Sequence, residues 1–149
     1  MEVPLIKGAG MAGVPERAQA QATRVLVVDD DPGVREVIIG ALRSHGWRAA
    51  GAADGLDALR RLQHEEFGAV VTDLQMPRLD GLALLREVRR LEHPIPVVVP
   101  TSLLDKQVES RLRWAGAFQV LSKGGPLRDL VRSVEEACLP SRRDPARCA

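Results

Sequence analysis

Three carboxylates, one hydroxyl and one ammonium each follow a short apolar run of this chain. Asp29 and Asp30 come after R-V-L-V-V, Asp73 comes after A-V-V-T, and Thr101 and Lys123 come after two later runs. A β-branched run that is stopped by turn residues is typical of a buried strand that ends in a loop. Because ligands of open parallel sheets bind beyond the carboxyl ends of the strands, we expect these five side chains to meet at one end of a sheet.

These residue types suit metal-assisted phosphoryl chemistry. Three neighbouring carboxylates repel one another, and a divalent cation with oxygen ligands removes that repulsion. Mg²⁺ suits such a site because it keeps several waters and bridges to phosphate. Asp73 could then attack a phosphorus atom and become an aspartyl phosphate. The Lys123 ammonium and the Thr101 hydroxyl would stabilise charge on the transferred group.

Each of these residues also has an ordinary structural interpretation. Acidic residues at strand ends form turns and cap helices, and a threonine or a lysine at such a place is commonly structural or solvated. The functional prediction therefore rests on the combination, since five chemically compatible side chains follow four predicted strands at the same end.

Five apolar runs that alternate with helical patterns predict the sheet that would hold these residues. The predicted strands are 24–28, 47–53, 67–73, 95–99 and 117–121. The predicted helices begin at Pro32, at Gly55, near Leu82, near Leu104 and at Pro126. A βαβ series of this kind predicts an α/β fold, in which a doubly wound parallel sheet carries five helices on its two faces.

The two ends of the chain carry no sustained hydrophobic period. We expect a flexible leader over 1–23, in which 14–22 could form a helical turn or two, and a flexible tail over 139–149. A single domain over 24–138 lies between them and is long enough to bury a core. We expect no second domain after it.

Composition and charge exclude several classes of protein. The 149 residues include 21 Lys and Arg against 20 Asp and Glu, for a net charge of +1. This balance gives no reason to expect nucleic acid or an anionic membrane as a partner. No apolar stretch approaches the roughly 18–20 residues of a membrane helix, and the start of the chain does not read as a signal peptide. We expect a cytoplasmic globular protein.

Four segments together resemble the receiver domains of two-component response regulators: R-V-L-V-V-D-D-D-P, A-V-V-T-D-L-Q-M-P-R-L-D-G, I-P-V-V-V-P-T-S and A-G-A-F-Q-V-L-S-K. The resemblance runs over about 24–138 and implies a flavodoxin-like sheet with strand order 2-1-3-4-5. It implies that Asp73 is the phosphoacceptor and that Thr101 and Lys123 contact the phosphoryl group. The Mg²⁺ ligands that it implies are Asp29, Asp30, Asp73 and the backbone carbonyl of Gln75.

The resemblance also implies a function. The chain would be a phosphorylation-dependent signalling switch that accepts a phosphoryl group from a histidine kinase, a phosphotransfer protein or a small acyl phosphate. It would catalyse only its own phosphorylation and dephosphorylation, and it would bind no nucleic acid directly. The signal would leave by contact between the face formed by 104–138 and a downstream protein that the sequence does not identify. Formation of a homodimer through the same face is an alternative output.

Four residues depart from the usual pattern of the family. Gly124 stands where a proline usually follows the lysine, and Val120 replaces an aromatic residue whose rotation reports phosphorylation. Pro100 precedes the threonine and removes a backbone N–H that could join the sheet. Phe118 occupies a usually polar position, where we expect it to offer an exposed apolar contact. These departures leave the chemistry intact and concern the output surface.

Two other functions fit part of the pattern. A pseudo-receiver of the same fold would act as an interaction module without phosphorylation, and the departures at Val120 and Gly124 favour it. A metal-dependent phosphohydrolase would also use Asp73 as its nucleophile, but it would need an acid or base two residues later, where Gln75 cannot ionise. Since neither Gln75 nor Leu103 is a strong base, we expect slow to moderate self-dephosphorylation.

Overall fold

The structure is a computed structural model that describes residues 13, 15–21 and 23–139. Its strands are β1 (Arg24–Val28), β2 (Arg48–Ala52), β3 (Ala69–Thr72), β4 (Val97–Thr101) and β5 (Gln119–Ser122). Its helices are α2 (Glu16–Gln21), α3 (Pro32–Ser44), α4 (Gly55–His64), α5 (Gly81–Arg89), α6 (Lys106–Trp114) and α7 (Leu127–Cys138). The five predicted helices are present, and α2 lies in the segment where the sequence predicts a helical turn or two.

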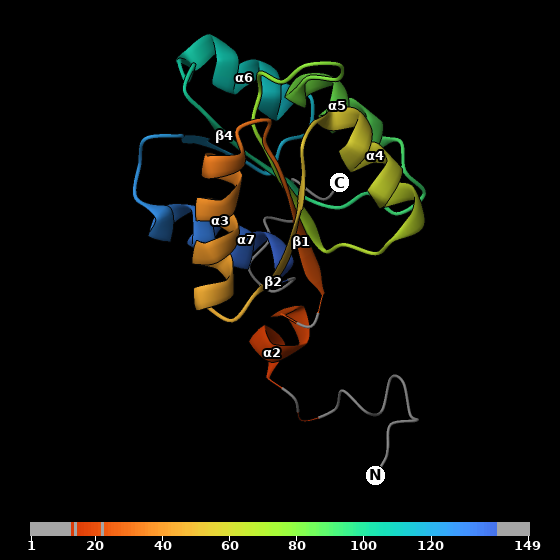
Figure 1. Cartoon of the computed structure of the whole chain (residues 1–149), viewed down its shortest axis with the longest axis vertical. Helices are drawn as coiled ribbons and strands as arrows, with labels where there is room; N and C mark the ends of the chain where they lie inside the picture. The colour runs from red at the N-terminus through yellow and green to blue at the C-terminus, as the bar shows by residue number, and fades with distance from the viewer. Residues whose placement is uncertain (1–12, 14, 22, 140–149) are drawn as a thin grey trace.

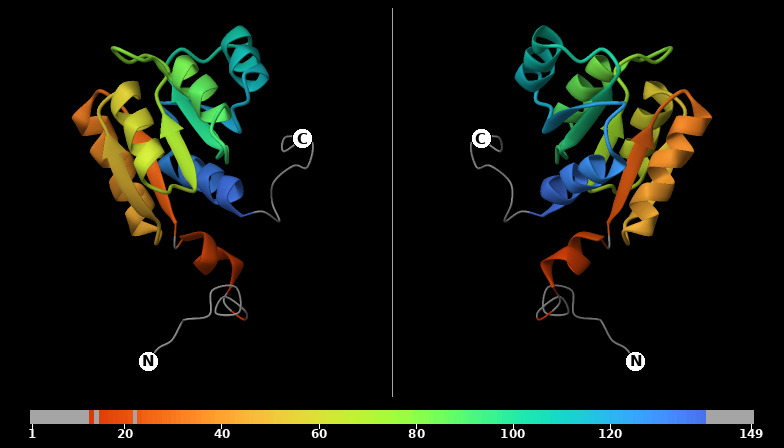
Figure 2. Two further views of the ribbon diagram at one scale, coloured as in Figure 1. Left: turned by 90° about the vertical axis from the view of Figure 1, so that its right-hand side faces the viewer. Right: turned by 90° about the vertical axis from the view of Figure 1, so that its left-hand side faces the viewer.

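The strands form one parallel sheet in the order β2-β1-β3-β4-β5, which confirms the predicted doubly wound α/β fold. Figures 1 and 2 show α3 and α7 on one face of this sheet and α4, α5 and α6 on the other. The strand order reverses between β1 and β3, and this switch point opens a crevice at the carboxyl ends of the strands.

The central strand β1 explains why the sheet forms from continuous apolar runs. Val25 and Val27 face the core under α3 and α7, whereas Leu26 and Val28 face the core under α4, α5 and α6. All four side chains are at most 1% exposed. Successive strand side chains point to opposite faces, so a strand that is covered on both faces needs an apolar residue at every position.

Four of the helices begin at an aspartate that follows a strand or its loop. The carboxylate of each accepts a hydrogen bond from a backbone N–H of the first turn, as expected of an N-cap. These N-cap residues are Asp31, Asp54, Asp80 and Asp105. Helix capping therefore falls to these four residues, and not to Asp29, Asp30 or Asp73.

The strand predicted over 95–99 is wrong in its bounds, because β4 runs over Val97–Thr101 and includes Pro100. The Pro96 carbonyl accepts from the N–H of Val70 on β3. In a strand, the backbone N–H and C=O groups of every second residue point toward the same neighbouring strand. The nitrogen of Pro100 therefore also faces β3, but pairing with β3 ends at Val98, opposite Val71. The missing N–H lies beyond the last pair, so β4 continues through the proline to Thr101.

The expectation that Phe118 offers an exposed contact is also wrong. Its side chain is 8% exposed and belongs to the core beneath α7, together with Leu130 and Val131. Phe118 directly precedes β5, and its N–H donates to the Val97 carbonyl at 2.8 Å. This bond holds the residue against β4, where burial of the large apolar ring is favourable.

The α2 helix is packed against the domain. Gln21 Nε2 donates to the His45 carbonyl at 2.8 Å, and Ala20 packs against the core under α3 and α7. The predicted flexible leader over 1–23 and flexible tail over 139–149 lie mostly outside the described residues and stay predictions.

Candidate functional site

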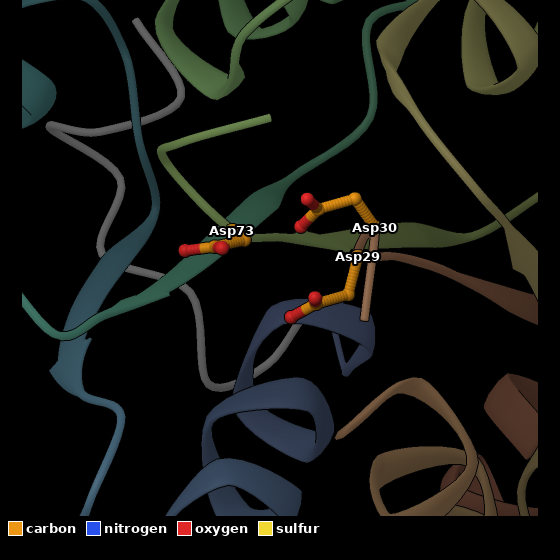
Figure 3. Close-up of side chains that lie close together, drawn as sticks. All are labelled: Asp29, Asp30 and Asp73. Carbon is orange, nitrogen blue, oxygen red and sulfur yellow. The ribbon is translucent and has the colours of Figure 1, made fainter. Parts of the chain in front are cut away.

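The crevice at the carboxyl end of the sheet brings the predicted carboxylates together. Asp29 and Asp30 directly follow β1, and Asp73 directly follows β3 (Figure 3). One carboxylate oxygen from each residue lies within 4.8 Å of the others. Asp29 and Asp73 are 2% and 8% exposed, whereas Asp30 is exposed, so the cluster opens to solvent on the Asp30 side.

The backbone holds the two buried aspartates in place. Asp29 N–H donates to the Ala52 carbonyl at 3.2 Å, and Asp73 N–H donates to the Val28 carbonyl at 3.1 Å. These bonds continue the β1–β2 and β1–β3 ladders one residue beyond the strands. Both carboxylates are therefore presented from rigid sheet backbone rather than from a mobile loop.

Lys123 forms an ion pair with each of the two buried carboxylates. Its Nζ lies 2.9 Å from Asp29 Oδ2 and 3.0 Å from Asp73 Oδ2. Burial by itself would lower the pKa of Lys123, but the hydrogen bonds to the two carboxylates outweigh burial and raise this pKa above its ordinary value. The ammonium therefore stays charged and holds both acids at neutral pH.

The remaining oxygen of each buried carboxylate accepts a backbone hydrogen bond. Leu74 N–H donates to Asp73 Oδ1 at 2.8 Å, and Asp31 N–H donates to Asp29 Oδ1 at 2.9 Å. The cluster contains three carboxylates, and Lys123 supplies one positive charge to it. An excess of negative charge therefore remains. The hard oxygen donors and this excess charge together fit a divalent cation such as Mg²⁺.

Thr101 and Gln75 lie at the same end of the sheet. Thr101 is the last residue of β4 and is 1% exposed, and its hydroxyl oxygen accepts from the Leu103 N–H at 3.1 Å. Because the hydroxyl oxygen accepts this bond through a lone pair, the group still has its own proton to donate. Gln75 is exposed in the loop that follows Asp73. The roles of both residues toward a metal or a phosphoryl group stay predictions.

The sequence interpretation missed Arg35 as a neighbour of this site. Arg35 is a residue of α3, and its Nη1 donates to the backbone carbonyl of Asp29 at 2.6 Å. Arg35 therefore holds the backbone that carries the acidic pair. The signal in the sequence is a basic residue near the start of the helix that follows Asp29 and Asp30.

A groove of about 730 Å³ opens beside Lys123. Apolar side chains line most of it, among them Val37 on α3 and Leu127 on α7, which are 55% and 41% exposed. The groove therefore offers an accessible apolar surface directly next to the carboxylate cluster.

The chain belongs to the response regulator receiver domain family, whose model matches residues 25–135. This confirms the resemblance found in the sequence, and with it the assignment of the chain to the receiver domains of two-component systems. The match covers every strand except the first residue of β1.

Curated relatives agree with this family. The chain is 41% identical over 122 residues to a protein-glutamate methylesterase/protein-glutamine glutaminase of Anaeromyxobacter dehalogenans, covering 79% of this chain and 33% of that protein. It is 37% identical over 112 residues to the response regulator MprA of Mycobacterium ulcerans, covering 74% of this chain and 47% of that protein. The chain thus spans a third to about half of the length of these relatives.

Solved structures show the same fold. A response regulator receiver protein from Pseudomonas putida has a TM-score of 0.72 at 31% identity, covering 76% of this chain and 96% of that one. The receiver domain of a sensor histidine kinase from Pseudomonas aeruginosa, described with a magnesium ion coordinated in its active site cleft, has a TM-score of 0.71 at 29% identity, covering 78% and 97%. Within the described residues, no helix is long and apolar enough to cross a membrane.

Proposed function

We propose that this chain is a phosphorylation-dependent switch of a two-component system and that Asp73 is its phosphoacceptor. The observation that carries the proposal is the position of the Asp73 carboxylate. It is held on rigid backbone, hydrogen-bonded to Lys123, and within 4.8 Å of two further carboxylates. Membership of the receiver family supports the same assignment.

Each residue of the site has its own proposed role in phosphoryl transfer. An oxygen of Asp73 forms a bond to phosphorus while the bond from phosphorus to the donor's nitrogen or acyl oxygen breaks. Lys123 moves from the free carboxylate to the phosphoryl oxygens, and the Thr101 hydroxyl donates to another of them. Mg²⁺, held by Asp29, Asp30, Asp73 and the Gln75 carbonyl, would neutralise the charge that develops on the transferred group.

A histidine kinase or a phosphotransfer protein is the proposed donor. Its phosphohistidine must reach Asp73, and the apolar groove beside Lys123 lies where the donor protein would approach. An amphipathic helix of the donor could bury its apolar side against Val37 and Leu127, which are both partly exposed on this groove. We propose that the chain lies in the cytoplasm with such a donor and catalyses only its own phosphorylation and dephosphorylation.

The output is proposed to be a protein contact on the 104–138 face, with homodimer formation as the alternative. Leu104 is 37% exposed and Trp114 is 94% exposed there. Val120 is buried at 5% exposure and carries no ring that could rotate. We propose that the phosphorylated state acts through the backbone that follows β5, where Lys123 N–H donates to the Thr101 carbonyl at 3.0 Å. We propose no direct contact with nucleic acid.

Treatment with acetyl phosphate and Mg²⁺, followed by mass measurement, tests the phosphoacceptor. We expect the wild-type chain to gain one phosphoryl group and the Asp73→Asn variant to gain none. Asp105→Asn is the matched control, because asparagine caps a helix as well as aspartate does, and it should retain full uptake. Uptake by Asp73→Asn equal to that of the wild type would contradict the assignment of the nucleophile.

The same experiment separates this function from that of a pseudo-receiver, which the buried Val120 and the glycine at 124 favour. A pseudo-receiver would neither bind Mg²⁺ nor take up a phosphoryl group. Sizing of the chain before and after phosphorylation then distinguishes self-association from contact with another protein, because only the former changes the molecular size of the isolated chain.

A further inference from the structure

Arg78, in the loop between Asp73 and α5, has an unusual backbone conformation. Its φ is 68°, and among the described residues it is the sole non-glycine with a positive φ. L-amino acids rarely adopt this left-handed conformation, because Cβ lies too close to the following carbonyl oxygen. Such a residue persists where the surrounding structure holds it, and this is commonly at a functional site.

An ion pair with Asp54 holds Arg78 in this conformation. Arg78 Nη2 and Nε lie 2.5 Å and 2.9 Å from Asp54 Oδ2. The other oxygen of Asp54 accepts from the Asp57 N–H at 2.9 Å and caps α4. The hydrogen bond from Asp57 and the Arg78 guanidinium lower the pKa of Asp54 despite its burial. The loop is thus tied to the N-terminus of a packed helix.

Two close backbone approaches hold the same loop. A Cβ on Gly55 would lie 2.2 Å from the Leu79 carbonyl oxygen, and a Cβ on Gly81 would lie 2.2 Å from the Asp73 carbonyl oxygen. Gly81 N–H also donates to the Leu74 carbonyl at 2.8 Å, which closes the base of the loop. The loop over 74–80 is therefore pressed against α4 at one side and closed directly behind Asp73.

We infer that the Arg78–Asp54 pair is a positioning element of the metal site. It holds the 74–80 loop so that the backbone carbonyl of Gln75 can share a cation with the Asp73 carboxylate. This inference rests on the proposed function, because that function assigns Gln75 to the Mg²⁺ ligands. Neither Arg78 nor Asp54 is among the proposed Mg²⁺ ligands. Their effect on the metal site is therefore indirect and passes through the position of the 74–80 loop.

Two substitutions separate positioning from simple electrostatics. Arg78→Asn removes a positive charge, and asparagine tolerates the left-handed conformation. Asp54→Asn removes a negative charge but keeps the helix cap. If the two side chains acted on a cation through charge alone, the first change would strengthen Mg²⁺ binding and the second would weaken it. If they position the loop, both changes weaken binding.

The experiment measures the Mg²⁺ dissociation constant of the folded, full chain by calorimetry at fixed ionic strength. We expect each single variant to weaken binding by roughly three- to tenfold, and the double variant to be no weaker than either single one. Amide hydrogen exchange of the four residues of 75–79 other than Pro77, which has no amide hydrogen, should accelerate in all three variants. Arg78→Lys, which keeps the charge, should restore part of the affinity.

The matched controls are Arg90→Asn and Glu87→Gln, which remove the charges of an exposed ion pair at the far end of α5. They should leave Mg²⁺ affinity and loop exchange unchanged. Wild-type affinity in both Arg78→Asn and Asp54→Asn, or shifts of opposite sign, would overturn the inference while leaving the proposed function intact. Absence of Mg²⁺ binding by the wild-type chain would instead overturn the proposed function together with the inference.

Discussion

At the scale of single residues, Lys123 neutralises part of the negative charge of the two buried carboxylates. It comes from the end of β5 and contacts carboxylates that follow β1 and β3. The side chain of Lys123 is 21% exposed, and Asp29 is 2% exposed. Charges of this kind are costly to bury without a partner, so the ammonium that we propose for contact with the phosphoryl group also stabilises the fold.

We predict that Lys123→Met destabilises the metal-free chain by about 2–3 kcal/mol, because it leaves two buried carboxylates without their cation. Saturating Mg²⁺ should recover much of this loss, since the ion binds the native state and replaces the missing positive charge. Urea unfolding with and without Mg²⁺ measures both effects. Lys106→Met, at the exposed start of α6, removes an equal charge and should change neither value.

At the scale of elements, Gly81 of the helix α5 and Gly40 of the helix α3 lie in different surroundings. Gly81 begins α5 at a place where a Cβ would collide with the Asp73 backbone, whereas a Cβ on Gly40 would meet no atom within 4 Å. Gly40 is exposed in the middle of α3, so its missing side chain only weakens the helix.

We predict that Gly40→Ala raises the free energy of unfolding by about 0.5–1 kcal/mol, through higher helix propensity and a less flexible unfolded chain. Gly81→Ala should lower it by roughly 1–3 kcal/mol, because backbone must move to admit the methyl group. Thermal and urea unfolding of the two variants provide the comparison. A stabilising Gly81→Ala would show that Gly81 does not lie against the Asp73 backbone in solution.

At the scale of the whole molecule, the two ends of the sheet carry different charge arrangements. The carboxyl end holds the acidic cluster. At the amino end, Glu65 accepts from Arg24 at 2.6 Å and from Arg61 at 3.0 Å, and both guanidiniums lie over the ring of Phe67, at 4.6 Å and 5.7 Å from its centroid. This cluster links the start of β1, the end of α4 and the segment before β3.

The amino-end cluster gives a prediction for pH. Hydrogen bonds from Arg61 and Arg24 lower the pKa of Glu65 to about 2 in the folded chain. The folded pKa lies below the unfolded one, so the stabilisation is complete above about pH 4.5 and is lost as the pH falls toward about 2. Glu65→Gln should therefore reduce the dependence of the unfolding free energy on pH in this range. Glu66→Gln, next in the chain and outside the cluster, should leave the dependence as in the wild type.

Much of this molecule follows from residues that are near one another in the sequence. The R-V-L-V-V run predicts the bounds of β1, and Asp31 with Pro32 predicts the start of α3, because strand burial and helix capping depend on a few consecutive residues. The parallel topology then brings Asp29, Asp30, Asp73 and Lys123 to one end of the sheet. That these side chains could meet was therefore predictable from the order of the elements.

Other features depended on contacts between distant parts of the chain, and local pattern could not reveal them. Arg78 and Asp54 are 24 residues apart, and Lys123 and Asp73 are 50 apart. The burial of Phe118 and the continuation of β4 through Pro100 likewise depend on how α7 and β3 lie beside them. The sequence by itself determined the elements, their order and the carboxylates at their ends. Only the tertiary structure decided which charge neutralises which and how the loop behind Asp73 is held, because packing brings those side chains together.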